Sequence, residues 1–257
     1  MLPFERLRSL ARSGADDSVL VAETADCLGE FADDPTQLVT VCRRLLAHHV
    51  ASGPLWWLCA HVVAAANPDD GARDAMRRLH ADRTAARLAS LLPFPHDEPI
   101  AVLGWPEIAG RALAERPDLD VVAIRPRQGD RMMTARLRRV EQPIRVVEEA
   151  QAAALGPSHL IIETSAASPT TALVPEATAD LRWGLGATPL WLVVATGRLL
   201  PGRLFDVLHA EVRRQEIDLE DLDVTTVAQI AGPAGLETPD RLKHRVDCPV
   251  APELLRL

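Results

Sequence analysis

Short apolar runs alternate with segments of helical spacing between residues 98 and 201. Continuous apolar runs rich in β-branched residues are typical of strands buried on both faces of a parallel sheet. The runs cover 100–103, 121–124, 144–147, 160–162 and 190–194, and the helical segments cover 107–115, 131–140, 148–155 and 176–185. This alternation predicts an α/β domain with a mostly parallel sheet and helices on both of its faces.

The chain before this region has the pattern of helices. Apolar positions recur at helical spacing along 17–31, 37–50, 55–66 and 72–91, with turn-forming residues between these segments. Pro93, Pro95 and Pro99 form a stiff connector into the first predicted strand. The sequence therefore predicts a helical N-terminal domain over residues 1–95.

The second predicted domain, over residues 96–257, is Rossmann-like with a C-terminal tail. After Arg203 the pattern predicts one further helix, 204–215, followed by the acidic segment 216–223 and an irregular tail that is rich in proline. The predicted fold class is thus α/β, with a helical domain followed by a Rossmann-like, mostly parallel sheet.

Composition narrows the range of partners. With 257 residues, 47% of them hydrophobic, and a net charge of −8, the chain resembles an ordinary globular protein and lacks the basic balance of a general nucleic-acid binder. The apolar run 55–66 is too short to span a membrane, and it contains His61. The first residues lack the order of a signal peptide. We therefore expect a cytoplasmic protein that binds neither nucleic acid nor membrane.

A metal site is not expected from the cysteines and histidines. A zinc site can be drawn from Cys27, Cys42, His48 and His61, but their spacing fits no common ligand pattern. Apolar helical segments hold three of the four cysteines, where small buried thiols are common. The sequence predicts no bound metal.

The loops after the strands decide the candidate chemistry, because ligands of open parallel sheets bind beyond the carboxyl ends of the strands. The first strand is followed by Gly104-Trp105-Pro106, where a dinucleotide fingerprint requires glycine. The chain also lacks the P-loop, the nucleophile elbow and the zincin motif, so no cofactor is expected. Ser165 and Ser168 lie near Glu163 without a neighbouring histidine, which favours serines that cap the next turn.

Arginines supply the other candidate chemistry. The loop Arg125-Pro126-Arg127-Gln128-Gly129 follows the second strand, where guanidinium groups and free amides can hold a phosphate or a carboxylate. A solvated loop that simply ends the strand explains the same residues equally well. Arg83 lies in the last helix of the first domain, and its periodicity alone favours a solvated position.

Motif order suggests a family. Three segments are similar to motifs of one family: the loop 125–129 to an R-P-x-x-x-G-type loop, Leu222–Thr225 to F-D-V-T-P, and Arg83–Leu88 to R-P-T-A-x-x-L without its proline. Two further segments stand where that family has other motifs. Residues 232–239 take the place of a T-E-x-G element, and Ser52–Pro54 takes the place of an R-G-A loop without its arginine. With these motifs, residues 37–240 resemble the translation initiation factor 2B α/β/δ group. That group includes methylthioribose-1-phosphate isomerase and ribose-1,5-bisphosphate isomerase.

The resemblance implies a helical domain followed by a Rossmann-like sheet, with a bound phosphorylated small molecule. The expected phosphate-binding residues are Arg125, Arg127 and the amide of Gly129, with Arg83 and Ser165. The resemblance also implies a homodimer formed by the C-terminal domain, here through 199–227. The helix in this segment carries Leu204, Phe205, Val207 and Leu208 on one face, which would pack either on a second copy or on the chain's own sheet.

Departures from the isomerases bear on activity. They use a cysteine just after the first sheet strand, where this chain has Gly104-Trp105-Pro106, and an aspartate after the fourth strand, where it has 163–168. The lysine near the phosphate is missing as well. Aldose–ketose isomerisation needs groups that move protons between adjacent carbons. We therefore expect a non-catalytic protein with a regulatory or assembly role; the alternatives are a divergent sugar-phosphate isomerase that uses Glu163, and a ligand-free interaction scaffold.

Overall fold

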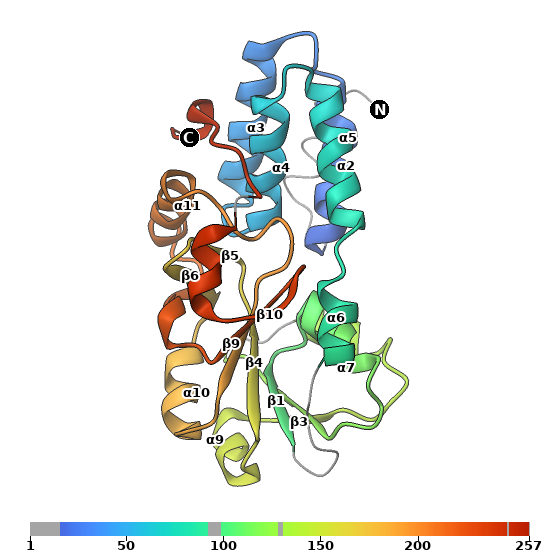
Figure 1. Ribbon diagram of the computed structural model, residues 1–257, viewed down its shortest axis with the longest axis vertical. Coiled ribbons are helices and arrows are strands. Elements are labelled where there is room, and N and C mark those ends of the chain that lie inside the picture. The colour runs from blue at the N-terminus through green and yellow to red at the C-terminus, as the bar shows by residue number, and fades with distance from the viewer. Residues whose placement is uncertain (1–15, 92–98, 128–130, 246, 257) are drawn as a thin grey trace.

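A bundle of helices stands on one end of an α/β sandwich (Figure 1). The computed structural model describes residues 16–91, 99–127, 131–245 and 247–256. The bundle helices are α2 (Asp17–Gly29), α3 (Pro35–His48), α4 (Gly53–Ala64) and α5 (Pro68–His80). The central helix, α4, is apolar on all sides, and its Trp56 and Trp57 are fully buried. The predicted helical N-terminal region is therefore present, and its described part is built around α4.

The predicted single helix over 72–91 is wrong, because the chain breaks between α5 and α6 (Thr84–Leu91). Asp82 Oδ1 accepts hydrogen bonds from the amide of Thr84, at 3.3 Å, and from its hydroxyl, at 2.7 Å. Such local bonds compete with helical ones and start a new helix. α6 then packs against α7 and the sheet, so the packing partner changes near Asp82. The predicted domain boundary at residue 95 lies outside the described residues.

The main sheet has seven strands within the described residues, in the order β10-β9-β7-β4-β1-β2-β3. All neighbouring pairs are parallel except β9 with β10. The strands predicted from apolar runs are all present: β1 (Ile100–Leu103), β2 (Val121–Ile124), β3 (Arg145–Val147), β4 (His159–Glu163) and β7 (Leu190–Val193). The helices along this sheet are α7 (Glu107–Ala114), α8 (Arg131–Leu137), α9 (Glu149–Ala152), α10 (Thr178–Leu185) and α11 (Gly202–Arg214). The predicted α/β fold class is confirmed.

The tail that was expected to be irregular instead supplies two strands, β9 (Gln229–Gly232) and β10 (Gly235–Glu237). Their apolar runs are very short and flank Gly232-Pro233, so their pattern is that of a loop. Pairing along the free edge of β7 makes β9 a strand. The rest of the tail forms the 3₁₀ turns η3 (Pro239–His244) and η4 (Pro252–Leu254).

A small antiparallel sheet, also missed by the sequence pattern, joins the two parts of the molecule. In the described residues it consists of β5 (Ala166–Ala167), β6 (Thr171–Pro175) and β8 (Leu219–Asp223). β8 is the acidic segment, in which Leu222 is the buried residue. Short 3₁₀ turns, η1 (Ala153–Leu155) and η2 (Val224–Thr226), complete the described elements.

The apolar face of α11, which was predicted as a possible dimer surface, is used inside the chain. Leu204, Phe205, Leu208 and Val212 are at most 4% exposed and belong to the same core as the bundle helices. The C-terminal segment covers this core further, since Trp57 Nε1 donates to the carbonyl of Asp247 at 2.6 Å. Within the described residues, no helix combines the length and apolar character that a membrane span needs.

Candidate functional site

A cleft of about 250 Å³ lies where the helical bundle meets the loops at one end of the sheet. Its walls come from α2, α4, α5, α7 and the loop after β7; the charged and polar lining includes Asp17, His80, Asp82, Glu107, Arg111, Thr196 and Arg198. Asp82 Oδ1 accepts a hydrogen bond from Thr196 Oγ1 at 3.1 Å, which ties the α5–α6 turn to the sheet. This is the ligand position expected beyond the carboxyl ends of parallel strands.

Two charged side chains are buried at the floor of this region. Glu163, the last residue of β4, is 8% exposed, and Arg198 is 6% exposed. Arg198 Nη2 donates to Glu163 Oε1 at 2.9 Å, and Arg198 Nη1 donates to the carbonyl of Thr164 at 2.7 Å. Arg198 also lies 3.5 Å from a carboxylate oxygen of Asp17 on α2. The pair therefore links the sheet to the helical bundle.

The second oxygen of Glu163 occupies the N-terminus of α7. Glu163 Oε2 accepts hydrogen bonds from the amides of Ile108 and Ala109, each at 2.9 Å. A helix N-terminus offers unpaired amides and a favourable dipole to an anion. The internal carboxylate thus takes the place that a bound phosphate fills in many α/β proteins.

Burial and charge act in opposite directions on this pair. Burial raises the pKa of the Glu163 carboxyl above its ordinary value, and the Arg198 charge together with the amides of Ala109 and Ile108 opposes that shift. For Arg198, burial alone would lower the pKa, but the charges of Glu163 and Asp17 raise it. The charge of each group therefore favours the charged form of the other.

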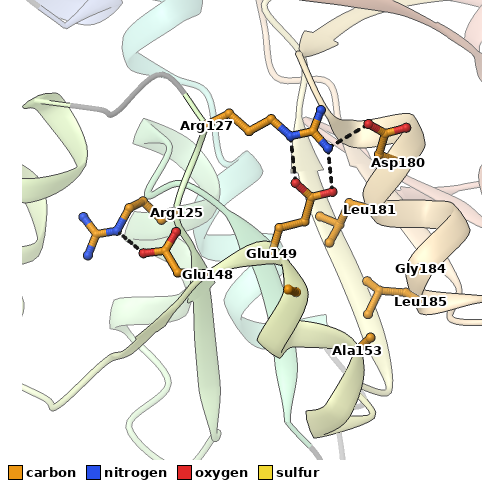
Figure 2. Close-up of a pocket in the computed structure, with 10 residues that line it drawn as sticks. Arg125, Arg127, Glu148, Glu149, Ala153, Asp180, Leu181, Gly184 and Leu185 are labelled. Atoms are coloured by element: carbon orange, nitrogen blue, oxygen red, sulfur yellow. Dashed lines mark hydrogen bonds and ion pairs between the residues drawn. The ribbon is translucent and has the colours of Figure 1, made fainter.

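The predicted phosphate loop lies at a different pocket, of about 390 Å³, formed with α9 and α10. Arg125 Nε donates to Glu148 at 2.8 Å, and Arg127 bridges Glu149, at 2.9 Å, and Asp180, at 2.7 Å. In Figure 2 the Arg125 guanidinium points away from that of Arg127, which lies between the carboxylates of Glu149 and Asp180. The bond to Glu149, and then that to Asp180, raises the pKa of Arg127. Carboxylates of the chain itself therefore already pair with both arginines.

Comparison with solved structures identifies the fold. No model of a known protein family matches the sequence, and no curated protein matches it. The translation initiation factor eIF-2B of Pyrococcus horikoshii OT3 aligns over 93% of this chain and 98% of its own, with a TM-score of 0.71 and 12% identity. The chain has the initiation factor 2B fold.

Other structures with this fold include an assembly subunit and an enzyme. A chain of the tetrameric eIF2B-beta2-delta2 complex from C. thermophilum aligns over 94% of this chain and 92% of its own, with a TM-score of 0.69 and 13% identity. The 5-methylthioribose 1-phosphate isomerase of Pyrococcus horikoshii OT3 aligns over 94% and 85%, with a TM-score of 0.61 and 12% identity. The expected resemblance is confirmed for the fold.

Within this initiation factor 2B fold, Trp105 stands where the isomerases are expected to carry their cysteine. Trp105 is 3% exposed, and its indole lies against Gly110 of α7 so closely that a Cβ on Gly110 would be 2.7 Å from the indole nitrogen. Its side chain therefore fills the core between β1 and α7. Glu163, near the place where the isomerases are expected to carry their aspartate, is likewise turned inward and is not among the residues that line the cleft.

The structure does not bring all of the predicted site residues together. Arg83 is exposed at the turn before α6, next to Asp82 of the cleft, and forms no ion pair with a described residue. Ser165 lies at the contact between the sheet and the bundle, where its carbonyl accepts from the amide of Gly53 at 3.2 Å. Gly129 is outside the described residues. The phosphate site at Arg125, Arg127 and Gly129 thus stays a prediction.

Sequence reasoning missed Arg111 and Arg198, and it interpreted Ser168 correctly. Ser168 Oγ accepts from the amides of Thr170, at 3.3 Å, and Thr171, at 3.0 Å, which is the capping role expected of it. Arg111 lies one turn into α7, the helix that follows the first strand, so its place in the sequence was a usable signal. Nothing in the local sequence of Arg198 shows that it meets Glu163.

Within the described ranges, no group of histidine, cysteine and acidic side chains is arranged to hold a metal ion.

Proposed function

We propose that this chain is a non-catalytic protein of the initiation factor 2B fold that binds a phosphorylated small molecule, a metabolite or a nucleotide, in the cleft between its bundle and its sheet. The observation that carries the proposal is that one charged side chain at this site is paired inside the protein, whereas another lines the cleft without an ion-pair partner among the described residues. Glu163 is fully engaged in internal contacts, whereas Arg111 lines the cleft and forms no ion pair with any described residue.

Arg111 is the group best placed to meet an anion. It projects from the exposed side of α7, and Arg83 lies nearby on the turn that carries Asp82. Guanidinium groups bind phosphate through charge-assisted, bidentate hydrogen bonds. The carboxylates of Asp17 and Glu107 on the same walls can accept hydrogen bonds from sugar hydroxyls. A phosphorylated sugar presents both kinds of group.

The size of the cleft restricts the ligand. At about 250 Å³ the cleft is slightly smaller than typical drug-sized pockets, which begin at roughly 300 Å³. This volume suits a sugar phosphate or a mononucleotide and is small for a dinucleotide.

A regulatory or assembly role is supported by the fold alone, because a similar chain is a subunit of a tetrameric complex.

Glu163 is not positioned to act as a catalytic base. An aldose–ketose isomerisation needs a base within hydrogen-bonding reach of a substrate carbon-bound proton. Both oxygens of Glu163 instead accept hydrogen bonds from α7 and Arg198. Releasing the carboxylate would leave the charge of Arg198 buried with a more distant partner, Asp17.

A thermal-shift screen with inorganic phosphate, pentose phosphates, methylthioribose 1-phosphate and mononucleotides tests the proposal. We expect one phosphorylated compound to raise the melting temperature by several degrees at saturating concentration, since binding to the folded state alone stabilises it. The same compound incubated with the protein should be recovered unchanged. No stabilisation across the panel supports the scaffold reading, and turnover of methylthioribose 1-phosphate supports the isomerase reading; either result contradicts the proposal.

A further inference from the structure

The cleft between the bundle and the sheet carries more negative than positive charge. Within the described residues, its acidic lining groups are Asp17, Asp82 and Glu107, and its basic ones are His80, Arg111 and Arg198. The charge of Arg198 is already balanced by Glu163, which it meets at 2.9 Å. Even if His80 is protonated, the lining carboxylates therefore outnumber the positive charges that are left to balance them.

The excess is concentrated at the inner end of the cleft, around Arg198. Asp17 Oδ2 lies 3.5 Å from Arg198 Nη2, which also bonds to Glu163. Burial alone would lower the pKa of Arg198, but nearby negative charge raises it. The carboxylates responsible are, in decreasing order, those of Glu163, Asp17, Glu107 and Asp82. One guanidinium balances the charge of one carboxylate, so the others remain in excess.

Among the described residues, Glu107 is the carboxylate of this group that has no hydrogen-bond or ion-pair partner. By contrast, Asp17 Oδ1 accepts a hydrogen bond from Ser52 Oγ at 2.6 Å, and Asp82 holds the turn between α5 and α6. Glu107 lies one helical turn before Arg111 on α7, and both residues line the cleft. The helix thus presents an acceptor and a donor of opposite charge, side by side, to a ligand.

We propose that the ligand carries a protonated amine as well as its phosphate, and that Glu107 binds the amine while Arg111 binds the phosphate; this inference rests on the proposed function. A phosphate alone would add roughly two negative charges to a cleft that already has an excess of them. An ammonium group restores the balance and forms charge-assisted hydrogen bonds with a carboxylate. A resident metal ion is not the source of the positive charge, because no set of ligands for one is assembled in the described parts of the chain.

Amino-sugar phosphates belong to this class and suit the volume of the cleft, about 250 Å³. Glucosamine 6-phosphate and glucose 6-phosphate are a matched pair of probes, since they differ by an amine in place of one hydroxyl. In calorimetric titrations near pH 7 we expect the amine compound to bind roughly tenfold more tightly, because a hydrogen bond between charged groups is the stronger one.

A change of pH tests the charge of the amine on the unaltered protein. An amine next to electron-withdrawing groups titrates near about pH 8, as an α-amino group does. At a pH of about 9.5 the amine is therefore largely neutral, and the preference over glucose 6-phosphate should disappear. Because both compounds are measured at each pH, their ratio cancels any titration of the protein.

Glu107→Gln tests the assigned residue. This variant should bind glucosamine 6-phosphate roughly tenfold more weakly, and it should bind glucose 6-phosphate more tightly because a negative charge near the phosphate is removed. Glu115→Gln is the matched control, since Glu115 is an exposed acidic residue at the end of the same helix and does not line the cleft. It should leave both affinities unchanged. The melting temperature of each free variant verifies that it folds.

Equal affinity of the wild type for the two sugar phosphates near pH 7, or a preference that persists in Glu107→Gln, overturns this inference and leaves the proposed function intact. The same holds if glucose 6-phosphate reaches the affinity of the amine compound once magnesium is added, or if a phosphorylated compound without an amine binds and neither sugar phosphate does. Absence of binding by every phosphorylated compound overturns the proposed function and this inference together.

Discussion

Replacing Glu163 with alanine is expected to lower the free energy of unfolding by about 3–5 kcal/mol. The substitution leaves Arg198, which is 6% exposed, without its close carboxylate, and it leaves the amides of Ile108 and Ala109 without an acceptor. Breaking a buried pair by removing one partner is strongly destabilising because an uncompensated charge remains. Urea unfolding followed by circular dichroism measures the loss.

Two controls separate the buried pair from a general effect of charge. Glu148→Ala removes a carboxylate from a pair with Arg125 whose side chains are 64% and 52% exposed, and it also removes the N-cap of α9, so its effect should stay within about 2 kcal/mol. Formate is small enough to refill the space left in Glu163→Ala, and at high concentration it should restore part of the lost stability while leaving Glu148→Ala unchanged. An unfolding free energy for Glu163→Ala equal to that of Glu148→Ala contradicts the role assigned to the pair.

Replacing Trp57 with alanine is expected to lower the free energy of unfolding by about 3–5 kcal/mol. Trp57 is fully buried in the centre of the bundle, its ring lies 3.9 Å from that of His61, and its indole nitrogen bonds to Asp247 in the C-terminal segment. Truncation opens a cavity and also leaves the carbonyl of Asp247 without this donor. Thermal unfolding monitored by calorimetry gives the magnitude.

The matched control is the same change at the exposed tryptophan. Trp183→Ala should alter the free energy of unfolding by no more than about 0.5 kcal/mol, because a side chain that is 91% exposed loses little contact when it is truncated. Trp57→Phe keeps most of the buried ring and loses the hydrogen bond, so its effect should fall between the two alanine variants. If Trp57→Ala and Trp183→Ala lower the free energy of unfolding equally, the assignment of Trp57 to the bundle core is contradicted.

The strands that were predicted from the sequence are those whose own residues are apolar along nearly their whole length. Runs such as Val121–Ile124 are buried at every position, so the apolar pattern is sufficient to find them. β8 escaped because an edge strand of a small sheet can be mostly acidic, with Leu222 as its buried residue. The break at Asp82 was not predicted because the apolar pattern runs across it; besides the local bonds from Thr84, the turn is held by a hydrogen bond from Thr196, a residue far away in the sequence. Tertiary partners decided these elements.

The candidate site was predicted only in part for the same reason. The loop at Arg125 and Arg127 was chosen because it follows a strand, but the carboxylates of Glu148, Glu149 and Asp180 were not expected beside it. Glu163 was chosen as a carboxylate near a family position, and its burial could be learned only from its contact with Arg198. Arg111 was accessible to sequence reasoning, since it lies on the first helix after the first strand.

The affinity of the stabilising compound for four proteins, measured by calorimetric titration, tests the location of the ligand. The proteins are the wild type, Arg111→Ala in the cleft, the double variant Arg125→Ala/Arg127→Ala at the loop, and Arg87→Ala, which removes an exposed arginine of α6 that does not line the cleft. Loss of a charge-assisted hydrogen bond to phosphate corresponds to about 1.5–3 kcal/mol, or roughly 10- to 150-fold in affinity. We expect a loss of this size for Arg111→Ala and no more than about a twofold change, under 0.5 kcal/mol, for the other two variants. Unchanged affinity in Arg111→Ala, with binding abolished in the double variant, would place the ligand at the loop and contradict binding in the cleft.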